Sequence, residues 1–194
     1  TAIGTNSLTA NTTGTTNVAV GTQALCSNVS GSCNTAIGQE AGRKHTGTNL
    51  TAVGYLAGAC NTSGGTHTVF GSQAGRFNTT GASNVAMGFS ALLDNTTGSC
   101  NVALGREALA NNTTADSNVA VGSCSLQANT TGGANTAVGA YSLDSNTTGY
   151  ANTAIGCDAM QTNTEGFHNV AVGENSLELN TTGDQNVAIG VTAL

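Results

Sequence analysis

A glycine that follows one small and one apolar residue returns along the whole chain at a nearly fixed interval. Ten of the eleven intervals equal the step from Gly4 to Gly21, which defines a 17-residue unit, and the interval from Gly38 to Gly54 is one residue shorter. Self-similarity at a fixed period is the signature of stacked repeats, in which each unit contacts only its neighbours. We therefore expect a single repeat array over residues 1–194. Positions below are counted from the glycine of each unit, which is position 0; these glycines are Gly4, Gly21, Gly38, Gly54, Gly71, Gly88, Gly105, Gly122, Gly139, Gly156, Gly173 and Gly190.

The three residues before each glycine have the alternation of a short β-strand. Position −1 is apolar in all twelve units, position −3 is always Val or Thr, and position −2 is Ala in every unit except one. From the unbroken apolar row we expect position −1 to face the core, so that Ile155→Asp would bury a charge. Leu or Met at position +4 in nine units predicts a second wall of that core. The small residues at −2 and +3 predict close approach by another sheet or chain.

A turn closes each unit at positions +7 to +10, where the sequence N-T-T-G recurs, as in Asn95–Gly98. Asn and Gly both tolerate the left-handed backbone that tight turns need. A helical repeat of twice this period is excluded, because consecutive 17-residue units are alike and carry no helical apolar stripe. The sequence therefore predicts an all-β fold, a parallel β-solenoid (β-roll) of about twelve 17-residue coils. Coils about 4.8 Å apart would make a rod about 53 Å long.

Composition excludes several functions. Only 7% of the residues are charged, with 4 Lys and Arg against 10 Asp and Glu, which gives a net charge of −6. Such a chain cannot neutralise phosphates, so we expect no nucleic-acid partner. No apolar run approaches the roughly 20 residues of a membrane-spanning helix, so we expect no membrane insertion of this segment.

The units resemble repeats of known fibrous proteins. Asn118–Gly122 reads N-V-A-V-G and Asn152–Gly156 reads N-T-A-I-G, as in the head repeats of trimeric autotransporter adhesins. With the N-T-T-G spacer, the units also resemble repeats in the tail fibres of phages and other viruses. The resemblance implies a non-catalytic, extracellular or virion-surface fibre segment. Its partners would be copies of itself, in a homotrimer or a head-to-tail fibre, and surface glycans.

Two asparagine rows follow the repeat, at positions +7 and −4. Stacked Asn side chains can form a hydrogen-bonded ladder, which we expect for both rows. Nine asparagines of the +7 row also begin an N-x-[S/T] sequon, so a glycan-coated filament is an alternative. Those nine are Asn11, Asn28, Asn61, Asn78, Asn95, Asn112, Asn129, Asn146 and Asn180. The Thr rows at +8 and +9 offer a further alternative, because flat Thr arrays are typical of ice-binding solenoids.

The remaining polar residues form no catalytic or metal-binding motif, so we expect no enzyme, cofactor or metal. Of the six cysteines, only Cys26 and Cys33 are placed to form a disulfide within one coil. In the shorter unit, Gly42–Gly47 replace the usual Leu and turn, and Arg43, Lys44 and His45 within this segment are a candidate contact site for an anionic glycan or a neighbouring subunit. His45 replaces a ladder asparagine. Neither end of the array has an atypical capping unit, so we expect a segment of a longer chain.

Overall fold

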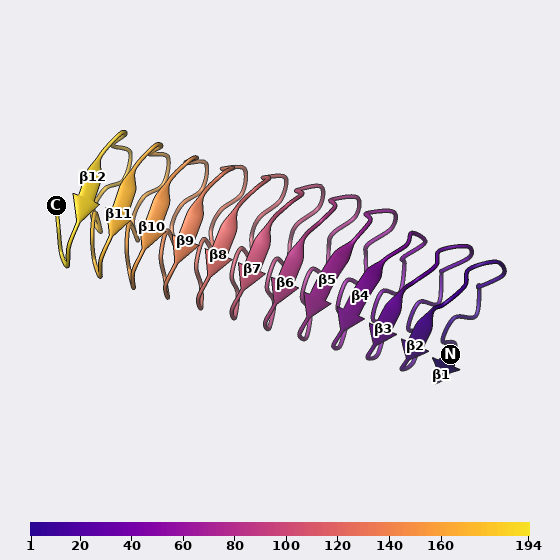
Figure 1. Ribbon diagram of the computed structural model, residues 1–194. Coiled ribbons are helices and arrows are strands. Elements are labelled where there is room, and N and C mark those ends of the chain that lie inside the picture. Colours follow the sequence, from indigo (N-terminus) through magenta and orange to yellow (C-terminus); the bar gives the residue numbers. More distant parts are fainter.

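Each repeat folds into one coil, and in the computed structural model, which describes residues 1–194, the coils stack along a single axis (Figure 1). Every coil contributes one short strand to a parallel 12-stranded sheet in which the strands lie in sequence order. The strands are β1 (Ala2–Ile3), β2 (Val18–Val20), β3 (Thr35–Ile37), β4 (Leu50–Val53), β5 (His67–Phe70), β6 (Val85–Met87), β7 (Val102–Leu104), β8 (Val119–Val121), β9 (Thr136–Val138), β10 (Thr153–Ile155), β11 (Val170–Val172) and β12 (Val187–Ile189). The predicted parallel β-solenoid is confirmed.

The register keeps equal repeat positions beside one another. Ala19 of β2 pairs with Ala36 of β3, and both occupy position −2 of their units. Ala36 pairs in turn with Ala52 of β4, although the coil between them is one residue shorter than the others. The missing residue lies in the turn, so the strands themselves stay aligned.

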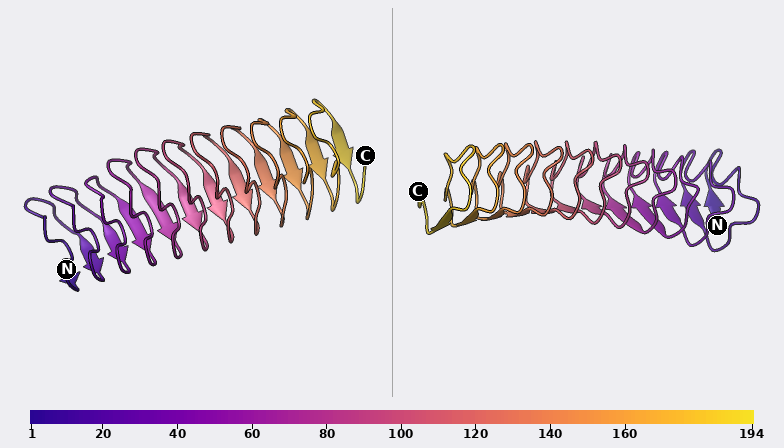
Figure 2. Two further views of the ribbon diagram at one scale, coloured as in Figure 1. Left: turned by 180° about the vertical axis from the view of Figure 1, so that it is seen from behind. Right: turned by 90° about the horizontal axis from the view of Figure 1, so that it is seen from above.

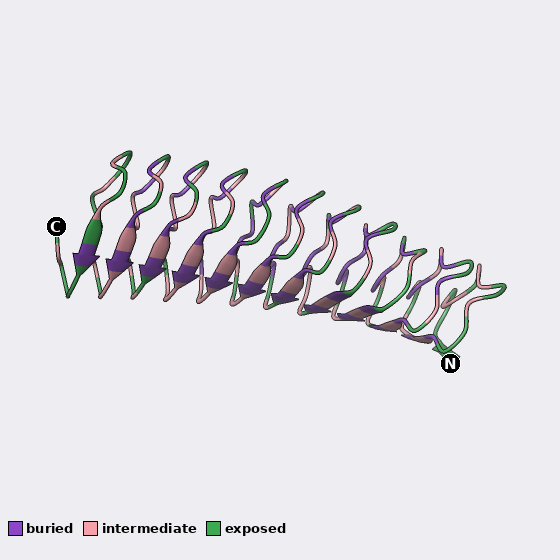
Figure 3. Ribbon diagram, turned by 45° about the horizontal axis from the view of Figure 1, so that its top comes forward, coloured by how far each residue is buried: buried purple, intermediate pink, exposed green.

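The strands face the interior through position −2, not through position −1 as the sequence suggested. In β10, Ala154 is completely buried, whereas Ile155 on the other side of the strand is 41% exposed. The same alternation runs through the sheet, whose strands carry buried and partly exposed residues in turn (Figure 3). The physical reason is the thin coil: the opposite wall lies so close that an Ala side chain fills the space, and the larger residues are directed outward. The expectation that position −1 faces the core was therefore wrong, and Ile155→Asp would not place its charge inside the coil.

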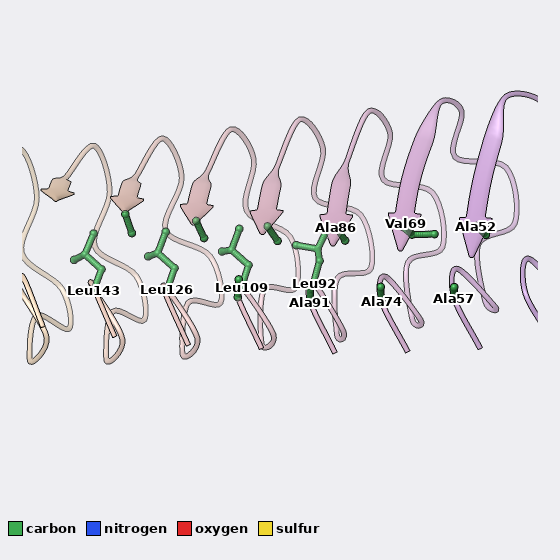
Figure 4. Close-up of a cluster of buried hydrophobic side chains, with 14 of the residues drawn as sticks. Ala52, Ala57, Val69, Ala74, Ala86, Ala91, Leu92, Leu109, Leu126 and Leu143 are labelled. Carbon is green, nitrogen blue, oxygen red and sulfur yellow. The ribbon is translucent and has the colours of Figure 1, made fainter. Parts of the chain in front are cut away.

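The opposite wall is formed by positions +3 and +4, as expected for the Leu row. Leu92, Leu109, Leu126 and Leu143 are buried and extend from this wall toward the sheet (Figure 4). The small residues at +3 and −2 lie inside the same coil and belong to its core, so they do not form a contact surface for another chain. Seen along the sheet edge, the strands and the returning turns form two thin layers (Figure 2).

Consecutive turns build the returning wall. In the coil of Gly122, the amide of Ser125 donates to the carbonyl of Gly122, and the amide of Asn129 donates to the carbonyl of Leu126. Such turns place non-glycine residues in the left-handed region, for example Cys124 at φ 57° and Leu126 at φ 51°. Gly122 itself has φ +137°, and a Cβ there would collide with the carbonyl of Gly139 in the next coil. Position 0 is glycine because the coils approach one another so closely at this corner.

Three successive coils have a different core. Their +4 position is Gly42, Gly58 and Gly75 in place of Leu. Leu50 enters the vacated space from the opposite corner, so that a Cβ on Gly42 would lie 2.7 Å from Cδ2 of Leu50. Val69 replaces the usual strand alanine and fills the space beside Gly58 and Gly75. A small cavity remains near these residues, with room for about one water molecule.

Candidate functional site

The most extensive polar feature of the rod is the buried row of asparagines at position +7. The Nδ2 of Asn95 donates to Oδ1 of Asn78 in the preceding coil at 2.6 Å, and Asn112 donates to Oδ1 of Asn95 at 2.8 Å. The same Nδ2 of Asn95 donates to the carbonyl of Gly98, in its own turn, at 2.9 Å. Each inner amide therefore donates twice and accepts once, and the row forms a ladder along the axis.

The asparagines at position −4 form a second ladder beside the first. The Oδ1 of Asn84 accepts the backbone amide of Asn101 in the next coil at 2.9 Å. Its Nδ2 donates to the carbonyl of Gly98 at 2.8 Å, so Gly98 accepts one amide from each ladder. The two rows are thus joined at the turn glycine, which explains why the turn and both asparagines recur together in the sequence.

Burial of the +7 row bears directly on the sequons. Asn95, Asn112, Asn129 and Asn146 are completely buried, and their amide hydrogens are engaged in the ladder. To carry a glycan, any of these asparagine side chains would have to leave the interior of the coil. Its hydrogen bonds to the two neighbouring coils would then be broken. The folded rod therefore does not present these sequons to solvent.

The threonines at position +8 are also used internally. The hydroxyl of Thr96 donates to the carbonyl of Thr113 at 2.9 Å, and Thr113 repeats this contact with Thr130 at 3.1 Å. The row continues through most of the rod. These hydroxyls are directed along the axis, so only the threonines at +9 remain as an exposed row, and they lie in turns instead of on a flat strand.

The +7 ladder is interrupted at His45. The ring is completely buried, yet neither Nδ1 nor Nε2 has a hydrogen-bond partner, and Oδ1 of Asn28 in the preceding coil is also unpaired. Burial, assisted by the neighbouring His67, lowers the pKa of His45 to about 4, while the nearby carbonyl of Gly47 opposes the shift without a well-aligned hydrogen bond. The imidazole is therefore neutral at pH 7, and the ladder has a gap between Asn28 and Asn61.

His67 replaces an asparagine of the −4 row and reproduces one of its contacts. Its Nδ1 accepts the backbone amide of Asn84 at 3.4 Å, as Oδ1 of Asn84 accepts the amide of Asn101 one coil later. Its Nε2 lies 3.3 Å from Nδ2 of Asn78 and near the carbonyl of Gly81. Burial lowers the pKa of His67 as well, and the nearby carbonyl of Gly81 partly offsets this effect.

The proposed contact site of Arg43, Lys44 and His45 does not exist as one surface. Arg43 pairs with Glu40 at 2.9 Å, Lys44 is exposed, and His45 points into the core. Arg43 and Lys44 lie on the outside of the turn, whereas His45 occupies the interior ladder position +7. The prediction that His45 belongs to a surface contact site was wrong, and a contact role of Arg43 and Lys44 stays a prediction.

The possible disulfide between Cys26 and Cys33 is not formed. All six cysteines are free thiols. The Sγ of Cys26 lies 3.6 Å from the carbonyl of Arg43, and the Sγ of Cys33 lies 3.2 Å from Oγ1 of Thr16. No group of three or more His, Cys, Asp or Glu side chains is arranged to hold a metal ion.

The feature that sequence reasoning missed is the outer side of the sheet. We define the outer sheet face as positions −3 and −1 of all twelve coils. It contains only Val, Thr, Ile, Leu, Met and Phe, and its most exposed members include Ile37, Phe70, Met87, Ile155 and Ile189. All charged residues of the chain lie at other repeat positions. The alternation in the sequence signalled two faces, but position −2 on one and position −1 on the other are both apolar, so hydropathy did not distinguish inside from outside.

Comparison of the chain with known proteins identified no related protein. No family model, curated protein or solved structure matches the chain. None of its segments forms a helix of the length and apolar character needed to cross a membrane.

Proposed function

We propose that this chain is a structural shaft or display segment of an extracellular fibre, adhesin or viral tail appendage, without a catalytic role. The observation that supports the proposal is continuity along one axis. Strands β1 to β12 form one parallel sheet, and the asparagine ladders run beside it through the same coils. A solenoid of this kind has a length set by its number of coils, which suits it to hold other modules at a fixed distance.

We further propose that the shaft associates with copies of itself, as a homotrimer or a continuous fibre. The outer sheet face supports this part of the proposal: it runs the length of the rod without a charge, and it is apolar except for a Thr at position −3 in six coils. Surfaces of this kind often mark protein interfaces. The resemblance of the repeats to adhesin heads and viral tail fibres agrees with it.

The contacts of the polar rows favour neither alternative function. Ice binding through the Thr rows would require free hydroxyls, whereas the +8 hydroxyls donate to neighbouring coils. A glycan coat on the +7 sequons would require exposed amides, whereas seven of the nine sequon asparagines are buried, and only Asn11 and Asn180, near the two ends, are half-buried. We therefore retain the shaft as the single proposed function.

The test is the location of the native protein. An antibody raised against an exposed corner, such as the one that carries Tyr150, would be used for immunogold electron microscopy of the producing cells or virions. Labelling along surface filaments or virion appendages is the expected result. Gold particles confined to the cell interior would rule out the proposal.

A further inference from the structure

We infer that the outer sheet face is the surface on which a second copy of this chain packs, sheet against sheet. This inference rests on the proposed self-association of the shaft and gives it a specific form, a face-to-face pair of rods in place of the homotrimer or head-to-tail fibre. It replaces the small-residue rows at −2 and +3, which lie inside the coil.

Chemical uniformity is the first argument. Position −1 is Val, Ile, Leu, Met or Phe in every coil, and position −3 is Val or Thr in every coil. Ile155 and Met87 are 41% and 45% exposed, although the neighbouring strands cover part of each side chain. The charged residues, 4 basic and 10 acidic, all lie elsewhere. A lipid headgroup, a nucleic acid or an ionic ligand would find no charged partner on this face.

Size is the second argument. Twelve strands spaced about 4.8 Å apart, with side chains across a width of about 10 Å, give a face of roughly 500 Å². That lies within the range of the largest apolar patches on monomeric proteins, which are often functional. Two such faces in contact would bury roughly 1,000 Å², about the minimum for a specific protein interface.

Geometry selects a second copy as the occupant. The outer sheet face repeats at the strand spacing, and only a surface with the same spacing can match it over its whole length. Another molecule of this chain supplies that surface, since the strands remain aligned from β1 to β12 despite the shorter coil. Two sheets that pack face to face lie about 10 Å apart and interdigitate their outward side chains. The same patch then serves on both partners, which is the usual form of a self-complementary interface.

The test is the mass of the purified chain in solution, measured by sedimentation over a roughly 20-fold range of concentration, from about 10 to about 200 µM. The wild-type chain is expected at twice its 19.0 kDa. Ile155→Asp, on the outer sheet face, is expected to give 19.0 kDa with an unchanged far-ultraviolet circular dichroism spectrum. Thr131→Glu, an exposed turn substitution away from this face, is the matched control and should keep the wild-type mass.

A milder variant covers the case in which Ile155→Asp fails to fold. Val121→Thr combined with Val138→Thr keeps the shape of two adjacent face residues and should weaken association roughly tenfold, because hydroxyls replace buried methyl groups. A wild-type chain that stays at 19.0 kDa throughout the concentration range would overturn the inference. So would a folded Ile155→Asp chain with the wild-type mass. Neither result would bear on the immunogold test, so the shaft and its interface can fail separately.

Discussion

Leu104 and Leu109 belong to the same coil, but their side chains point to different environments. Leu109 is completely buried in the core, and Leu104 of β7 is part of the outer sheet face. The two positions therefore separate the interior of the coil from the surface assigned to association.

This pair gives a direct test of which side is inside. Leu109→Ala should lower the free energy of unfolding by about 3 kcal/mol, because it leaves a cavity beside the neighbouring leucines. Leu104→Ala should cost less than about 1 kcal/mol under conditions that keep the chain monomeric. Urea denaturation followed by circular dichroism measures both. Equal losses would show that the assignment of the two faces is incorrect.

The +7 ladder predicts a large effect for a single amide. Asn95→Ala removes two donated hydrogen bonds and one accepted bond, and leaves buried groups on Asn78, Gly98 and Asn112 with fewer partners. We expect a loss of about 3 kcal/mol in the free energy of unfolding. Thr97→Ala, on the exposed side of the same turn, should change it by less than about 0.5 kcal/mol. A neutral Asn95→Ala would contradict a structural role for the ladder.

His45 offers the reverse experiment, since a substitution there can repair the ladder. His45→Asn should supply a donor to the unpaired Oδ1 of Asn28 and stabilise the chain by about 1 kcal/mol. His67→Asn is the comparison, and it should be closer to neutral because Nδ1 of His67 already accepts the Asn84 amide as an asparagine Oδ1 would. Thermal melting of the two variants would distinguish them, and a destabilised His45→Asn would mean that the shortened turn cannot accept the ladder geometry.

The buried histidines also predict how stability depends on pH. The pKa of His45 is about 4 in the folded chain and 6.5 in its reference state, so the unfolded chain binds more protons between these values. Above pH 6.5 His45 is neutral in both states and does not lower the free energy of unfolding. As the pH is lowered from 6.5 toward 4, this group lowers the free energy of unfolding by roughly 3 kcal/mol. The lowered pKa of His67 acts in the same direction. Denaturant titrations at several pH values should show this decline, and His45→Asn should flatten it. An equally steep decline in that variant would assign the effect to other groups.

Backbone strain gives one stabilising substitution. Ala134 is exposed and has φ 58°, a conformation that favours glycine. Ala134→Gly should raise the free energy of unfolding by about 1 kcal/mol, because the relief of strain exceeds the added entropy of the unfolded chain. Ala140→Gly, at a position without positive φ, should lower it instead. If both variants lose stability, the left-handed backbone at Ala134 is not maintained in solution.

The repeat period made most of the fold predictable, because each unit forms one coil and residues at the same repeat position lie beside one another in adjacent coils. The ladders were predictable for the same reason: Asn78 and Asn95 occupy the same position in adjacent coils. The orientation of the strand was not, because Ala154 and Ile155 are both compatible with a core. Which of the two side chains points inward depends on the distance between the sheet and the opposite wall, and this distance cannot be read from the sequence of a single unit. Likewise, Leu50 was not recognisable as a substitute for the missing leucines, since its contact with Gly42 across the coil forms only when the coil closes.

The three coils with Gly42, Gly58 and Gly75 have a consequence for how the chain reaches its structure. In an array of near-identical units, a strand that skips one coil finds almost the same partners and gains almost the same energy, so misthreaded forms compete with the native one. Leu50 and Val69 remove that degeneracy, because each fits only a coil that has lost its own leucine. A form that skips the coil of Gly42 or that of Gly58 would leave Leu50 without one of the two glycines beside which it packs. The irregular coils thus distinguish one part of the array from the others. They make the native order of stacked coils lower in free energy than forms in which a coil is skipped.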